Sequence, residues 1–110
     1  MPITNVTLYN LVGDELGLLS GAEVLSTEDS DKIASRASGV RAWLIDEGIA
    51  FWADDAIPDA VKLSLAKIIA AECKTMFGRS DYDLGQLGYQ ELRQHCSKRS
   101  ARQPVAAEYF

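Results

Sequence analysis

The chain has 110 residues, 47% of them hydrophobic and 25% charged, which is typical of one small globular domain. Its formal net charge of −5 is divided unevenly, because residues 1–59 hold 11 acidic and 3 basic side chains whereas residues 60–110 hold 5 acidic and 8 basic ones. The acidic first half argues against a protein that binds in a DNA groove, and the uneven charge favours docking between complementary surfaces. The sequence shows neither an apolar run of membrane-spanning length nor a signal-peptide pattern.

The first predicted helix runs from Thr4 to about Leu16, with Thr4 or Asn5 as its cap and Gly17 as its stop. Apolar residues at three- and four-residue spacing predict one buried stripe on this helix: Val6, Tyr9, Val12 and Leu16.

The second predicted helix begins at Ser26, which can cap it, and runs to about Glu47. Glu28 and Asp29 follow in the first turn, where the helix dipole favours negative charge. Its inner face is predicted from the spacing of Ile33, Ala37, Val40 and Leu44, and Trp43 widens that face.

Residues 48–60, with the sequence GIAFWADDAIPDA, form a structured connection that we call the elbow. Gly48 can end the preceding helix by adopting a positive φ, and Pro58 can begin the next, where its missing N–H costs nothing. The third helix is then expected to run to Phe77, before Gly78, and to be about 30 Å long and central. Its predicted inner face consists of Val61, Leu65, Ile68, Ile69, Glu72, Cys73 and Met76.

Asp81 or Asp83 is expected to cap a fourth helix that reaches about Ser100, with Gly85 and Gly88 softening its first turns. Its apolar positions are Leu84, Leu87, Tyr89, Leu92 and Cys96. No strand pattern exceeds a few residues. We therefore predict an all-α fold, a small four-helix bundle-like domain over residues 1–101 with an extended C-terminal arm over residues 102–110.

Catalytic and metal chemistry have little support in this pattern. His95 and Cys96 are sequence neighbours, which point about 100° apart on a helix and so make a poor nucleophile–base pair. Asp54, Asp55 and Asp59 could suggest a metal cluster, but carboxylates before a helix are more simply caps. Cys73 and Cys96 are expected to be buried cytosolic thiols. No catalytic, metal-binding or cofactor-binding residue is predicted, and no enzyme activity is expected.

Aromatic and basic residues are the better candidates for contact with partners. Trp43, Phe51 and Trp52 lie beside a helix junction, where such residues complete a core or an interface more often than a ligand pocket. The basic cluster of Arg93, Lys98, Arg99 and Arg102 could meet carboxylates of a partner, phosphates or solvent. The arm ends in Tyr109 and Phe110, which are suitable anchors for a partner pocket unless this end is simply frayed.

The order of these features resembles that of the head–tail adaptor, or head-completion, proteins of tailed bacteriophages and gene-transfer particles. The resemblance rests on the Ser-Thr-Glu-Asp helix start, the amino-acid sequence of the elbow, the Met76-Phe77-Gly78 helix end and the basic fourth helix leading to Tyr109-Phe110. The tail-accessory family that stabilises packaged DNA in short-tailed phages is the closer likeness. This chain is shorter than members with a longer C-terminal arm.

That resemblance implies a dodecameric ring beneath the portal protein, which extends the DNA channel, retains packaged DNA and offers a platform to a downstream tail protein. It implies that Pro104, Val105, Tyr109 and Phe110 form the portal-binding arm, and that Trp43 and the elbow lie between protomers. Double-stranded DNA would pass through the lumen without sequence-specific binding. The expected location is the head–tail junction of a virion, assembled in the host cytoplasm, with no membrane partner.

Two other functions stay open from the sequence. A small DNA-associated regulator could use the basic fourth helix, and it would bind duplex DNA with a steep dependence on salt. An accessory of a cell-wall hydrolase could work through Asp54, Asp55 and Asp59, and alanine there would abolish turnover while preserving the fold.

Overall fold

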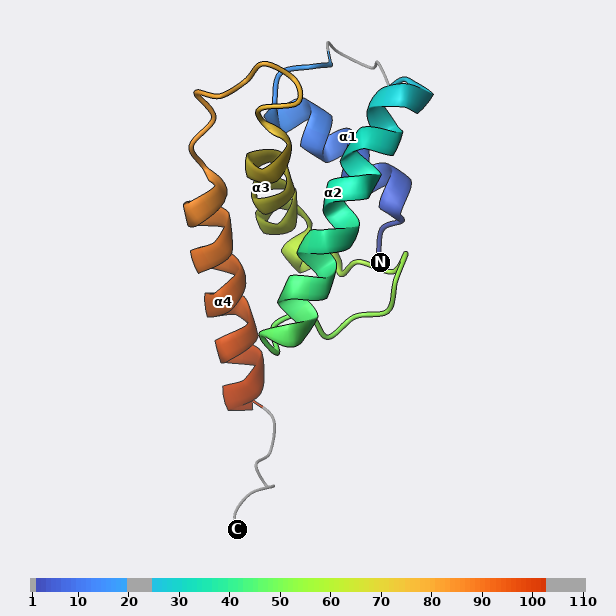
Figure 1. The fold of residues 1–110 in the computed structure, drawn as a ribbon. Helices are drawn as coiled ribbons and strands as arrows, with labels where there is room; N and C mark the ends of the chain where they lie inside the picture. Colours follow the sequence, from blue (N-terminus) through green and yellow to red (C-terminus); the bar gives the residue numbers. More distant parts are fainter. Residues whose placement is uncertain (1, 20–24, 103–110) are drawn as a thin grey trace.

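The described part of the chain contains four α-helices and one short 3-10 helix. They are α1 (Asn5–Glu15), α2 (Thr27–Asp46), η1 (Asp59–Val61), α3 (Lys62–Cys73) and α4 (Gly85–Arg102). Figure 1 shows how the labelled α-helices are arranged. This computed structural model describes residues 2–19 and 25–102, with side chains described as far as residue 96. Within these ranges the only β pairing is an isolated antiparallel bridge between Ile3 and Ile57, so the all-α prediction is confirmed.

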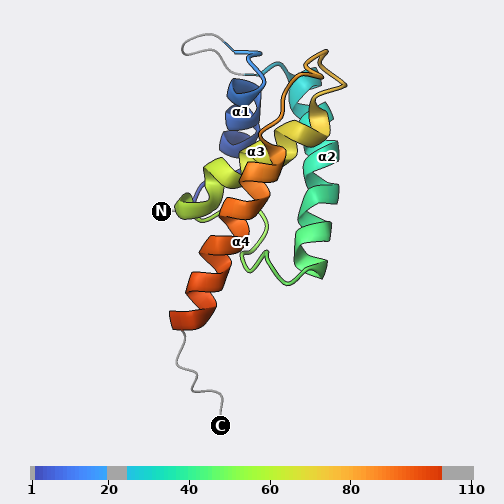
Figure 2. The ribbon, with the colours of Figure 1, turned by 90° about the vertical axis from the view of Figure 1, so that its left-hand side faces the viewer.

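α3 is the centre of the fold. Figures 1 and 2 show it between α4 on one side and α1 and α2 on the other, and all three helices pack against it. Its buried side chains therefore lie around much of the helix rather than along one stripe: Leu65, Ala66, Ile68, Ile69, Ala70 and Cys73. The central position was predicted from the sequence.

The predicted length of this helix was wrong. α3 has 12 residues, which corresponds to about 18 Å. The 3-10 helix η1 precedes it, and after Cys73 the chain makes turns as far as Gly78, whose φ of +68° marks a left-handed backbone. On the predicted inner face, Glu72 is exposed and Met76 only half-buried.

The ends of α1 and α2 follow the predicted signals. The Thr4 hydroxyl accepts the N–H of Thr7 at 3.3 Å, and the Ser26 hydroxyl accepts the N–H of Asp29 at 3.2 Å. Gly17 and Gly48 follow the two helices with φ values of +72° and +75°. A side chain at either glycine would strain this left-handed backbone.

The predicted stripe is correct for α2 and partly wrong for α1. Ile33, Ala37, Val40 and Leu44 are all buried, but Trp43, which was expected to widen this face, is 44% exposed. In α1 the buried apolar side chains are Leu8 and Val12, continued by Leu16, whereas Val6 is 65% exposed. Val6 precedes Leu8 by two positions, or about 200° around the helix, and so lies on the opposite side.

The start of α4 also differs from the prediction. The helix begins at Gly85 rather than at an aspartate cap, because the Leu84 carbonyl accepts the N–H of Gly88 at 3.0 Å. Of its predicted apolar positions only Leu92 is fully buried, while Leu84 and Leu87 are exposed. α4 contacts the bundle along a narrow line, and these two leucines fall outside it.

Close packing against α3 explains the glycines of α4. A Cβ on Gly85 would lie 2.4 Å from the Ala71 Cβ, and one on Gly88 would lie 2.7 Å from the Ser64 carbonyl oxygen. Distances this short are not tolerated by real side chains, so both positions have to lack a Cβ for the helices to approach this closely. The two glycines are therefore packing residues, not merely weak points in the helix.

Replacing Gly88 with alanine is expected to lower the free energy of unfolding by about 1–3 kcal/mol, because the new methyl group forces α4 away from α3. The matched control is Gly39→Ala in α2, where the added Cβ meets nothing within 4 Å. That change should raise stability by about 0.5–1 kcal/mol through helix propensity. Urea unfolding measures both, and equal effects of the two substitutions would contradict this account of α4.

Candidate functional site

An aromatic patch joins the C-terminal half of α2 to α4. The rings of Trp43 and Tyr89 stack with centroids 5.1 Å apart, and the Arg93 guanidinium lies 5.7 Å from the Tyr89 ring centroid. The Tyr89 hydroxyl donates to the Glu47 carboxylate at 3.1 Å. Desolvation first, and then the hydrogen bond to Glu47, raises the pKa of Tyr89. We call Trp43, Tyr89, Arg93 and Glu47 the aromatic patch.

Trp43 and Arg93, two residues proposed for partner contacts, thus lie together on the surface. Trp43 is 44% exposed, so one part of its ring packs on Tyr89 and the rest faces solvent. Arg93 is also exposed. The patch combines flat aromatic area with a positive charge, which is the chemistry enriched at protein interfaces.

The two elbow aromatics have different surroundings. Phe51 is 41% exposed and meets Trp52 edge to face, with centroids 5.1 Å apart. Trp52 is only 8% exposed and belongs to the hydrophobic core, so it is a core residue and not an exposed contact residue like Trp43. The chain turns at the elbow so that the larger ring covers the core and the smaller one faces outward.

The remaining predicted contact residues fall at the C-terminal end. Lys98, Arg99 and Arg102 belong to the last turns of α4, where side chains are not described. Pro104, Val105, Tyr109 and Phe110 lie outside the described residues. Both views show the last turns of α4 extending past the ends of the other helices (Figures 1 and 2). The basic sequence is therefore carried on a protruding helix end.

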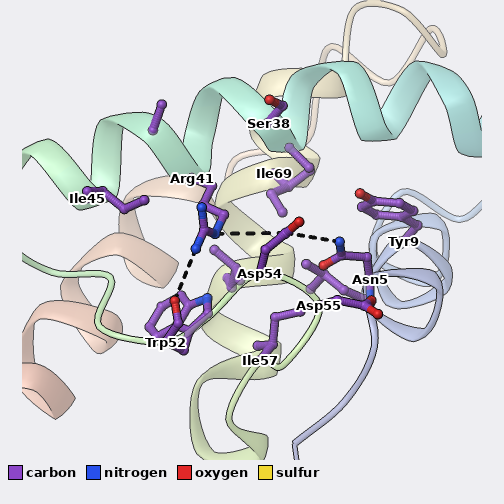
Figure 3. Close-up of a pocket in the computed structure, with 14 residues that line it drawn as sticks. Asn5, Tyr9, Ser38, Arg41, Ile45, Trp52, Asp54, Asp55, Ile57 and Ile69 are labelled. Carbon is purple, nitrogen blue, oxygen red and sulfur yellow. Dashed lines mark hydrogen bonds and ion pairs between the residues drawn. The ribbon is translucent and has the colours of Figure 1, made fainter.

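A pocket of about 330 Å³ lies between α1, α2 and the elbow, as Figure 3 shows. Part of its wall is apolar and comes from buried core residues: Trp52, Ile57, Leu65 and Ile69. Its polar groups come from Asn5, Tyr9, Ser38, Arg41, Asp54 and Asp55. A mostly formed cavity with an apolar wall and a few polar groups is the usual form of a binding site.

Asp54 and Asp55 hold the elbow against the start of α1. Asp55 Oδ1 accepts the backbone N–H of Asn5 at 2.8 Å, and Asp54 Oδ1 accepts the Asn5 side-chain amide at 3.2 Å. Asp55 adopts a φ of 63° to do so. The prediction that these carboxylates cap the helix that follows them is wrong, because no side chain caps η1. Asp55 instead accepts a first-turn N–H of α1, and Asp54 bonds to the Asn5 side chain.

Asp59 takes no part in that arrangement. It forms an ion pair with Lys62, with Nζ and Oδ1 2.7 Å apart, and this hydrogen bond holds the pKa of Asp59 below its usual value. Within residues 2–19 and 25–102, no group of three metal-ligating side chains is placed to hold a metal ion.

Arg41 is the central cation of the pocket. Its Nη2 donates to the Trp52 carbonyl at 3.1 Å, and its Nε lies 4.0 Å from Asp54 Oδ1 (Figure 3). This Nε is buried and has no hydrogen-bond partner. Burial, followed by the charges of Asp54 and Asp55, raises the pKa of Tyr9 on the pocket wall. Two carboxylates and one guanidinium leave the pocket with a net negative charge.

Sequence reasoning missed this pocket. Asp54 and Asp55 were considered as site residues, but Asn5 was considered only as a helix cap, Tyr9 only as part of an apolar stripe, and Arg41 not at all. They meet because the elbow folds back over α1 and α2, and an arginine on a helix face otherwise resembles any solvated charge.

A wider groove of about 840 Å³ runs along α2 toward the end of α3. It is lined by charges of both signs and by one edge of the aromatic patch, including Asp31, Lys32, Arg36, Trp43 and Glu72. Its mixed charges select no particular ligand class.

The two cysteines form no disulfide and lie in different environments. Cys73 is fully buried, and burial raises the pKa of its thiol to about 11. Cys96 is half-buried, and its Sγ donates to the Ile49 carbonyl at 3.2 Å, which ties α4 to the elbow. His95 beside it is also half-buried.

Cys73 should therefore react with iodoacetamide much more slowly than Cys96 in the folded protein at about pH 8, because the thiolate is the nucleophile and the Cys73 thiol stays protonated and covered. Peptide mass mapping after timed labelling measures both rates. In urea the two rates should become similar, which serves as the control. Equal rates in the folded protein would refute the buried position of Cys73.

Trp52→Ala should lower the free energy of unfolding by about 3–5 kcal/mol, because it empties a core site. Trp43→Ala should cost only about 1–2 kcal/mol, since part of that ring is exposed and stacking on Tyr89 is the main loss. Guanidinium unfolding followed by circular dichroism compares the two variants. A greater loss for Trp43→Ala would reverse the assignment of core and surface.

None of the helices in the described ranges has both the length and the apolarity that a membrane span requires. Comparison of the chain with protein-family models, with curated proteins and with solved structures finds no match in any of the three. Function is therefore inferred from the geometry of the aromatic patch and the pocket, together with the sequence pattern.

Proposed function

We propose that this protein is a structural adaptor that forms a ring at the head–tail junction of a phage-like particle, below the portal protein. One observation carries the proposal: the chain presents two unlike surfaces on different sides of α3. The net-negative pocket lies at α1, α2 and the elbow, and the basic end of α4 lies on the other side (Figure 1). A ring of identical copies needs two different, complementary surfaces on each copy.

The ring would extend the DNA channel, help to retain packaged DNA and provide a platform for a downstream tail protein. Its acidic residues favour a lumen that repels phosphate groups, so that DNA slides through without sequence-specific binding. The resemblance to adaptor proteins supplies the proposed copy number of twelve. It also supplies the role of residues 102–110 as the arm that binds the portal through Pro104, Val105, Tyr109 and Phe110.

A structural role agrees with the contacts of the acidic residues. Asp54 and Asp55, which a hydrolase accessory would need for chemistry, are engaged with Asn5 at the start of α1. Asp59 is paired with Lys62. We accordingly propose a protein without enzyme activity or cofactor, located at the junction in the virion.

A second candidate is a small DNA-associated regulator, and the extension of the basic end of α4 beyond the bundle favours it (Figure 2). A monomer of that kind would bind duplex DNA alone, with an affinity that falls steeply as salt rises. Titration of labelled duplex at two salt concentrations distinguishes it from an adaptor.

Removal of residues 102–110 should leave the helical core folded and abolish docking to the cognate portal, because the proposed arm is lost. Circular dichroism measures folding, and co-sedimentation with tail-less particles followed by electron microscopy measures docking. The matched variants are Tyr109→Ser with Phe110→Ser, which should weaken docking, and Ala106→Ser with Ala107→Ser, which should not. Undiminished docking of the truncated chain would refute the role of the arm.

A further inference from the structure

We propose that the pocket between α1, α2 and the elbow receives a lysine or arginine side chain from the basic end of α4 of a second copy of this chain. The inference rests on the proposed ring and specifies its contact between neighbouring copies. The partner copy completes a site that one copy contains only in part.

The composition of the pocket fits a long basic side chain. Its apolar wall, formed by residues such as Trp52 and Ile57, can cover an aliphatic stem, and Asp54 and Asp55 can receive a cationic head. A volume of about 330 Å³ is large enough for one such side chain with some of its backbone. An anionic ligand would meet two carboxylates and only one guanidinium.

Arg41 is already held inside the pocket. Its Nη2 donates to the Trp52 carbonyl at 3.1 Å, and its buried Nε lies 4.0 Å from Asp54 Oδ1. The pocket therefore has two carboxylates and only one fixed cation, and this excess of negative charge favours an incoming basic side chain.

Charge identifies a second copy as the source of this side chain. Residues 60–110 carry 8 basic side chains, four of them in α4 at Arg93, Lys98, Arg99 and Arg102. None of the residues that line the pocket belongs to α4, and α3 separates the two regions in Figure 1. Because α4 is packed closely on α3, its basic end is placed to reach the pocket of another molecule rather than its own.

Substitution on each side of the contact tests the proposal in the full-length chain. Ser38→Arg places a cation at the pocket, and Ser35→Arg places the same charge on an exposed part of α2 outside it. Lys98→Glu with Arg99→Glu reverses the charge of the incoming segment. Sedimentation velocity at about 0.05 M and about 0.5 M salt measures self-association, which should weaken at the higher salt.

The pocket variant Ser38→Arg and the double α4 variant should each lower the association constant about tenfold or more, whereas Ser35→Arg should change it by less than about twofold. Circular dichroism checks that each variant is folded. If Ser38→Arg fails to fold, Asp54→Asn replaces it, because asparagine keeps an acceptor for Asn5, with Asp46→Asn as its control.

Mixing the two defective proteins gives the sharpest result. The Ser38→Arg chain keeps an intact α4, and the double α4 variant keeps an intact pocket, so one contact forms between them. The mixture should give one-to-one dimers that grow no further, because the other two surfaces are blocked.

A wild-type chain that stays monomeric at low salt and every concentration would overturn the inference. So would a mixture that forms no dimer, or equal effects of Ser38→Arg and Ser35→Arg. If the α4 variant instead loses only salt-dependent binding to duplex DNA, the basic end serves nucleic acid and the inference fails. Portal docking is measured separately, so an adaptor that still docks while these tests fail would retain the proposed function and lose only this contact.

Discussion

Burial of α3 is the constraint on which the remaining structure depends. A helix of 12 residues covered by three others needs apolar side chains on most of its circumference, and α3 supplies them from Leu65 to Cys73. A core of this size leaves little tolerance for gaps. α4 meets the requirement by approaching α3 through Gly85 and Gly88, where any side chain would collide with the neighbouring helix. That close contact fixes the direction of α4 and leaves its basic end beyond the bundle.

Polar contacts at the edges of the core attach the connecting segments to the helices. The Tyr82 hydroxyl donates to Glu15 at 2.5 Å, and the Arg79 Nε donates to the Leu16 carbonyl at 2.8 Å, so the connection before α4 is fastened to the end of α1. The elbow is fastened to the start of α1 by Asp55 and by the bridge between Ile3 and Ile57. Both ends of α1 are thereby stabilised by segments distant in sequence. The pocket forms where the elbow, bound to the start of α1, also lies against α2.

This arrangement is suited to assembly. Rigid helices carry the aromatic patch and the protruding basic helix end, while the elbow holds the acidic pocket at a fixed place on another side. Rigid surfaces lose little conformational entropy when they dock, and charges of opposite sign orient the partners before contact. A protein that joins two larger assemblies needs both properties, which is why the proposed adaptor role follows more directly from surface layout than from any single residue.

The sequence alone determined the helical class, the boundaries of α1 and α2 and the buried stripe of α2. These depend on local signals: Ser26 and Thr4 accept nearby N–H groups, Gly17 and Gly48 permit a left-handed backbone, and Ile33 to Leu44 repeat at helical spacing. It also named Trp43 and Arg93 as candidates for partner contact, although it placed Trp43 on the inner face of α2, where only the structure shows the ring to be partly exposed.

Only the tertiary structure decided which of several local options each residue takes. Trp52 rather than Phe51 enters the core, Val6 faces outward, and Asp55 caps a helix fifty residues away, because the path of the elbow selects their neighbours. From the sequence, Gly85 and Gly88 are simply weak helix formers. Their role in packing depends on Ala71 and Ser64, which lie opposite them in the folded structure. The pocket also depends on tertiary structure. Arg41 and Asn5 become pocket residues only because distant segments of the chain meet, and the spacing of apolar residues along the sequence does not predict that meeting.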